Sequence, residues 1–139
     1  MTLEELAKEF ENISNNFSGE LEKEVGRGAK VIQAEAKMLA PVDTGNLRNN
    51  ITSDVDRQGN IIVGKVDCNA EYAPYVEYGT GIYSSLGTGR QTPWIYKDSK
   101  GFHYTRGQHP QPFMNPAFNN NIGKVVNNLE DFVKRLIKI

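Results

Sequence analysis

The sequence predicts an α+β fold, in which a long N-terminal helix and a C-terminal amphipathic helix pack on a small antiparallel β-sheet. Three observations favour this fold. Apolar residues recur at helical spacing near both ends of the chain, apolar and polar residues alternate between Leu47 and Asp67, and glycines and prolines divide the remainder into short pieces. We expect a single domain over residues 1–139, because a chain of 139 residues can bury one modest core.

The first 39 residues have the pattern of a helix. Thr2 and Glu5 have the spacing of a capping box at its start. Gly19, Gly26 and Gly28 each disfavour a helix by about 1 kcal/mol relative to alanine. The sequence therefore leaves open whether this region is one helix or two. The apolar stripe comprises Leu3, Leu6, Phe10, Ile13, Phe17, Leu21, Val25, Ile32, Ala36 and Leu39.

A proline and a turn-forming run follow the helix. Pro41 cannot continue a helix and restricts the residue before it. Asp43, Thr44 and Gly45 have the side chains and the backbone freedom of a tight turn. We therefore expect the helix to end here and the chain to reverse.

Two strands are predicted after this turn. Residues 51–55 alternate between apolar and polar, residues 61–66 form a second apolar run, and residues 57–60 supply a glycine-containing turn between them. We expect one face of this hairpin to lie on the helices. Residues 72–78 are predicted to form a brief helical turn or an edge element, because Pro74 excludes them from a central strand.

Residues 79–112 are predicted to be a flexible excursion from the fold. They contain many glycines and one further hairpin, with arms at residues 94–96 and 102–104. A long segment with so little regular structure is typical of disorder or of a working surface. Beyond Pro116, apolar residues at helical spacing predict the C-terminal amphipathic helix, which ends in basic residues that suit a helix C-terminus.

Composition limits the classes of function. The 16 basic and 17 acidic residues nearly cancel, so the chain as a whole has no positive field to attract nucleic acid or an anionic membrane. Cys68 is the only cysteine, which excludes an internal disulfide and favours a small buried side chain. The acidic start and the lack of a long apolar run predict neither a secretory signal nor a membrane span, and hence a protein that stays in the cytosol.

Catalytic chemistry has few candidate residues. His103, Arg106 and His109 could serve a small nuclease or toxin-like enzyme, and this alternative stays open. The two histidines alone do not complete a metal site, and the short glycine patterns lack the ending of a phosphate-binding loop. We expect no catalytic residues, no metal and no cofactor. A second alternative is a DNA-contacting adaptor, in which the aromatic residues interleave with basic ones.

Three punctuated motifs carry a resemblance to a known family. They are Lys37 to Arg48, with Ala-Pro-Val-Asp-Thr-Gly at its centre; Tyr72 to Thr80, with Val-Glu-Tyr-Gly-Thr at its end; and Gln111 to Ala117. In this order they resemble the HK97-gp10-like family of minor structural proteins of tailed bacteriophages. The resemblance implies a non-enzymatic protein of the virion neck, which helps head–tail joining or tail completion. It also implies a ring of identical subunits, other neck and tail proteins as partners, synthesis in the host cytoplasm, and a chain that is monomeric in isolation.

Within this interpretation, residues 79–112 are the expected assembly surface. The expected interface residues are aromatic or basic: Tyr75, Tyr78, Arg90, Trp94, Tyr96, Tyr104, Arg106 and Phe113. The expected structural positions of the motifs are Pro41, Asp43, Thr44, Gly45, Leu47, Glu77, Gly79, Pro112 and Pro116. For Glu77 the sequence leaves two alternatives, a buried ion pair with Arg48 or a solvated carboxylate.

Overall fold

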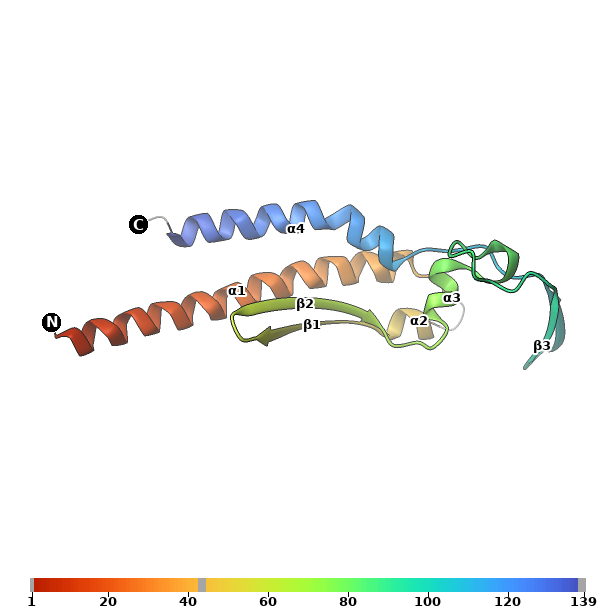
Figure 1. Cartoon of the computed structure of the whole chain (residues 1–139), viewed down its shortest axis with the longest axis horizontal. Coiled ribbons are helices and arrows are strands. Elements are labelled where there is room, and N and C mark those ends of the chain that lie inside the picture. The colour runs from red at the N-terminus through yellow and green to blue at the C-terminus, as the bar shows by residue number, and fades with distance from the viewer. Residues whose placement is uncertain (1, 43–44, 138–139) are drawn as a thin grey trace.

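A computed structural model describes residues 2–42 and 45–137 of the chain. The fold is mixed α+β, as predicted, and it is elongated along α1 (Figure 1). The two hairpins form separate two-stranded antiparallel sheets, β1–β2 and β3–β4. The elements in order are α1 (Leu3–Leu39), α2 (Asn46–Asn49), β1 (Ile51–Gln58), β2 (Ile61–Cys68), α3 (Ala73–Tyr78), the 3-10 turn η1 (Gly81–Tyr83), β3 (Trp94–Asp98), β4 (Gly101–Thr105) and α4 (Met114–Ile137).

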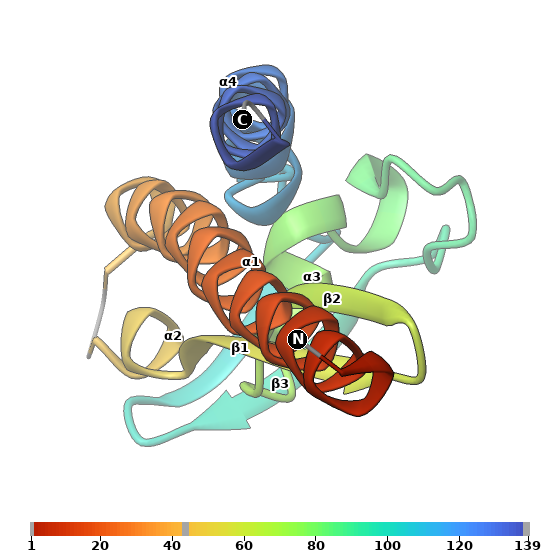
Figure 2. The ribbon, with the colours of Figure 1, turned by 90° about the vertical axis from the view of Figure 1, so that its left-hand side faces the viewer.

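Helix α1 is the central layer of the molecule. The β1–β2 hairpin packs against one side of it and α4 runs along another, as the view along the helix shows (Figure 2). The predicted capping box is present, because the Thr2 hydroxyl accepts from the Glu5 backbone N–H at 3.1 Å and the Glu5 carboxylate accepts from the Thr2 N–H at 2.9 Å. Within the described part of the chain, no helix combines the length and apolar character needed to cross a membrane.

The glycines of α1 neither break nor divide it, and residues 3–39 form one helix. A Cβ added at Gly28 would lie 2.5 Å from Val125 of α4, and one added at Gly26 would lie 3.2 Å from Val55 of β1. These two positions therefore let the neighbouring elements approach the helix backbone. Tertiary contact offsets the local cost that glycine imposes on the helix.

The β1–β2 hairpin is held against α1 by polar as well as apolar contacts. Its register pairs Ile51 with Cys68 and Gln58 with Ile61, so the strands extend into the predicted turn. The Gln33 side chain of α1 donates to the Ile51 carbonyl at 3.0 Å and accepts from the Ser53 hydroxyl at 2.7 Å. One face of the hairpin therefore lies on a helix, as predicted.

The core lies at the C-terminal end of α1. Phe113 and Ile51 are its largest fully buried side chains, and alanines surround them, which allows the backbones to approach closely. Leu47 is buried there from α2, a short helix that the sequence did not predict. The predicted turn residues Asp43 and Thr44 lie outside the described residues. The core residues are Ile32, Ala36, Ala40, Leu47, Ile51, Ala70, Ala73, Phe113 and Ala117.

The contact between Gly28 and Val125 can be tested by urea unfolding. Gly28→Ala should lower the free energy of unfolding by about 1–2 kcal/mol, because the new methyl must displace a stiff valine. Gly19→Ala is the matched control, since no atom lies within 4 Å of its added Cβ. That control should raise the free energy by about 0.5–1 kcal/mol through helix propensity. Equal stabilisation by both substitutions would contradict the close contact.

Candidate functional site

Glu77 joins the end of α3 to the start of α4. Its side chain is only 6% exposed, although it carries a carboxylate. One oxygen accepts from the backbone N–H groups of Phe113 at 2.7 Å and Met114 at 3.0 Å, and the other accepts from that of Asn115 at 2.8 Å. We call this set of three hydrogen bonds the Glu77 cap.

The Glu77 cap satisfies the groups that a helix N-terminus leaves free. The first N–H groups of a helix have no partner within the helix, and the helix dipole favours a negative charge beside them. Three charge-assisted hydrogen bonds also offset the cost of burying the carboxylate. Both sequence-based alternatives for Glu77 are therefore wrong. The proposed partner, Arg48, instead donates its Nε–H to the Lys37 carbonyl at 2.9 Å, near the end of α1.

The Glu77 cap also closes the base of the excursion formed by residues 79–112. The chain leaves the body directly after α3 and returns directly before α4, so the cap connects its two ends. Backbone hydrogen bonds reinforce this base: Thr80 N–H to Gln108 O at 2.9 Å, Ile82 N–H to Arg106 O at 3.2 Å and Gln111 N–H to Val76 O at 2.8 Å.

Two glycines allow the outgoing and returning segments to cross. Gly81 and Gly107 have φ values of 63° and 126°, which side chains of L-residues rarely adopt. A Cβ added at Gly81 would lie 2.0 Å from the Arg106 carbonyl oxygen, and one at Gly107 would lie 2.1 Å from the Thr80 carbonyl oxygen. At these positions glycine provides close backbone packing at the base of the excursion.

The β3–β4 hairpin forms the far end of the excursion, at the opposite end of the molecule from the N-terminus (Figure 1). It matches the predicted second hairpin. Ile95 pairs with Tyr104 and Lys97 with Phe102, so these four side chains share one face. Ile95, Phe102 and Tyr104 are 68%, 76% and 67% exposed. The hairpin therefore presents an apolar face to solvent, which we call the outer face.

The other face of the hairpin is held by stacking and hydrogen bonds. The Tyr96 and His103 rings stack with centroids 5.1 Å apart, and His103 Nε2 lies 2.8 Å from a carboxylate oxygen of Asp98. The Lys100 backbone N–H, which donates to Asp98 at 2.8 Å, and the His103 side chain lower the pKa of this exposed carboxyl group. Trp94 is half-buried, with the Arg90 guanidinium 5.7 Å from its ring centroid.

The histidines of the nuclease alternative have separate partners. His103 contacts Tyr96 and Asp98, whereas the His109 ring lies 3.9 Å from that of Tyr83. Among residues 2–42 and 45–137, no group of three or more histidine, cysteine or acidic side chains could hold a metal ion.

The remaining predicted interface residues lie in different environments. Tyr75 on α3 and Arg106 after β4 are exposed, and Tyr78 is half-buried. Phe113 is 0% exposed and belongs to the core, so its surface is already used within the chain. Sequence reasoning missed Ile95 and Phe102. Alternation along the two hairpin arms places both on the same face as Tyr104, and this signal was available in the sequence.

Comparison with protein-family models matches the N-terminal part of the chain to a known family. The family is described as "Bacteriophage HK97-gp10, putative tail-component", and the match covers residues 4–79. Because this is more than half of the 139 residues, the chain belongs to this family. Membership supports a phage structural role and contacts with other phage structural proteins. No curated protein and no solved structure matches the chain.

The matched region ends where the excursion begins. It includes α1 to α3 and therefore Glu77, but not the residues that Glu77 caps. The resembling motif at residues 111–117 also lies beyond it.

The Glu77 cap predicts a large effect of a small substitution. Glu77→Gln should lower the free energy of unfolding by about 2–3 kcal/mol, because an amide cannot accept at both positions and lacks the charge. Amide hydrogen exchange should accelerate at Phe113, Met114 and Asn115. Glu71→Gln, at an exposed position just before α3, is the matched control and should change stability by less than about 0.5 kcal/mol. Unchanged exchange in Glu77→Gln would contradict the cap.

The interaction between His103 and Asp98 can be tested by NMR titration of the Asp98 carboxyl group. His103→Ala should raise the pKa of Asp98 part of the way to its ordinary value, since the Lys100 N–H remains. A lowered pKa stabilises the hairpin above the ordinary pKa, and this contribution is lost as pH falls through the lowered value. His109→Ala should leave the titration unchanged. An Asp98 pKa that is insensitive to His103→Ala would rule out the interaction.

Proposed function

We propose that this protein is a non-enzymatic component of the head–tail junction of a tailed phage or prophage. In this proposal it helps to join or complete the connection between head and tail, as one subunit of a ring. Family membership supports the structural role. The observation that carries the more specific proposal is the exposed outer face of the β3–β4 hairpin.

A free outer face is unfavourable for an isolated chain. A single two-stranded hairpin is marginally stable in water, and burying apolar side chains is the usual way to stabilise it. The outer face presents two aromatic rings and an isoleucine together, and aromatic residues are enriched in protein interfaces. Packing against another virion protein would bury these side chains and fix the hairpin.

The proposed partner surface extends from the outer face toward α3. It takes in the exposed or half-buried residues predicted from the sequence, with two additions from the hairpin. These residues are Tyr75, Tyr78, Arg90, Trp94, Tyr96, Tyr104 and Arg106, together with Ile95 and Phe102. Phe113 would contribute indirectly, by anchoring the return of the excursion in the core.

The proposal can be tested in a phage or prophage that carries this gene. Deletion should give heads and tails that remain separate in electron micrographs, and the unaltered gene should restore joined particles. A gene that carries both Phe102→Ser and Tyr104→Ser should give at least about tenfold fewer joined particles than the unaltered gene, because clustered apolar anchors dominate an interface. The purified double variant should retain the circular dichroism spectrum and unfolding midpoint of the parent chain.

Two controls make this test specific. Ile61→Ser changes an exposed apolar residue at the tip of the other hairpin and should restore normal joining. His103→Ala with His109→Ala should also restore it, whereas a nuclease that uses these histidines would lose activity. Particles that lack the protein yet join normally would overturn the proposed function.

A further inference from the structure

The N-terminal part of α1 presents an apolar stripe to solvent. Leu3, Phe10 and Ile13 are 86%, 64% and 64% exposed, and Leu6 lies in the same stripe at 41%. Their spacing of three and four residues places them on one side of the helix. We call residues 3–17 the N-terminal segment. It carries four glutamates and one lysine, so its net charge is −3.

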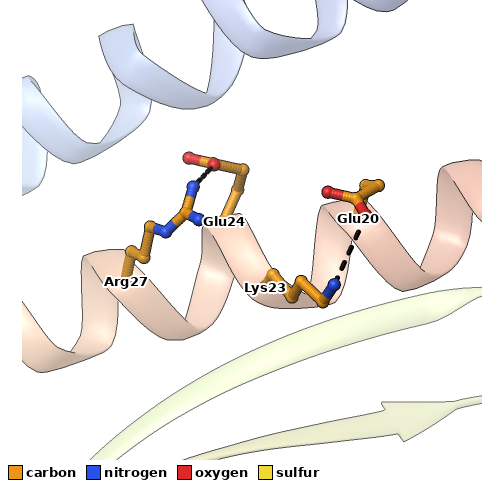
Figure 3. Close-up of polar contacts among 4 residues, drawn as sticks. All are labelled: Glu20, Lys23, Glu24 and Arg27. Carbon is orange, nitrogen blue, oxygen red and sulfur yellow. Dashed lines mark hydrogen bonds and ion pairs between the residues drawn. The ribbon is translucent and has the colours of Figure 1, made fainter.

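A groove with the opposite charge lies between α1 and α4. It has a volume of about 940 Å³, and its apolar floor includes Val31, Val125 and Leu129. Arg27 in its wall pairs with Glu24 on the side of α1 that faces α4 (Figure 3). With that pair cancelled, Lys124, Lys134 and Arg135 exceed the single Asp131, which leaves the groove lining at +2.

We infer that this groove binds the N-terminal segment of a second copy of the chain. The segment offers apolar side chains to the floor, and its glutamates complement the lysines and arginine of the wall. The occupant cannot come from the same chain. Glu24, Arg27 and Val31 of α1 form part of the groove, and the N-terminal segment continues the same uninterrupted helix away from them.

The length of the segment suits this site. Fifteen helical residues span about 22 Å, and the twelve residues of α4 from Lys124 to Arg135 span about 18 Å. Self-pairing of two N-terminal segments would bring like charges together. The neighbouring groove between α1, β2 and α4 is more apolar, but Lys65 and Asp67 cancel at its rim, so it offers no charge complementarity.

The contact uses different surfaces on the two copies, so it is heterologous and can repeat from subunit to subunit into a ring. The inference therefore rests on the proposed ring of identical subunits. The contact also predicts that purified chains associate at high concentration, in place of the monomer expected from the sequence, and this can be tested without phage particles.

Disulfide trapping between purified full-length chains tests the inference. All variants carry Cys68→Ser, which removes the only native cysteine. One tagged chain carries Phe10→Cys and a second, differently tagged chain carries Asn128→Cys in the groove. Oxidation of the mixture should give a dimer that contains both tags. Lys65→Cys, at the neighbouring groove, is the matched control partner and should give at least about tenfold less mixed dimer.

Other outcomes overturn the inference. These are the absence of mixed dimer at the highest soluble concentration, an excess of the Phe10→Cys homodimer, or equal trapping by Lys65→Cys. A charge swap gives a second measurement. Glu9→Lys with Glu11→Lys, or Lys134→Glu with Arg135→Glu, should each reduce trapping about tenfold, because attraction becomes repulsion. Trapping should recover when the Phe10→Cys chain carries the two glutamate-to-lysine changes and the Asn128→Cys chain carries Lys134→Glu with Arg135→Glu.

The two proposals fail separately. Normal trapping together with normal joining in the gene deletion would overturn only the proposed function. Absence of the mixed dimer together with a joining defect in the gene deletion would overturn only the inferred contact.

Discussion

The position of the excursion depends on one buried carboxylate. Glu77 accepts hydrogen bonds from backbone groups that lie 36 to 38 residues further along the chain. Without it, the N–H of Phe113, the residue directly before α4, would be buried without a partner, and a buried N–H is costly to leave unsatisfied. The same three bonds fix where the excursion leaves the body, where it returns, and how the Phe113 ring enters the core.

The position of the core explains why both ends of the molecule expose apolar surfaces. Its buried residues cluster where the C-terminal end of α1 meets α2, α3 and the start of α4. The N-terminal segment extends beyond that cluster at one end of the long axis, and the β3–β4 hairpin extends beyond it at the other (Figure 1). Both extensions expose apolar side chains in ordered patterns. Such patterns, unlike single exposed leucines, usually mark surfaces that another molecule covers.

Local signals predicted the regular elements well. The apolar periodicity and the capping box gave α1, and alternation gave both hairpins, because these features depend on neighbours within a few residues. The sequence could not assign α2, because its N-cap residue is Gly45, which has no side chain to form a capping hydrogen bond. The predictions for Glu77 and Phe113 were also wrong. Their sequence neighbours do not reveal their partners, because those partners come close only when the chain has folded. The glycines of α1 likewise suggested a break, although two of them serve packing against distant residues.

The Glu77 cap separates two sets of structural requirements. In the body of the molecule, α1 must approach α4 and β1 closely, and Phe113 must return to the core. In the excursion, the close backbone approach at Gly81 and Gly107 constrains the base. The outer face lies beyond both constraints, and its exposed side chains contribute little to the core of the body. Their apolar character is therefore difficult to explain by folding of this chain alone, whereas contact with a second molecule explains it directly.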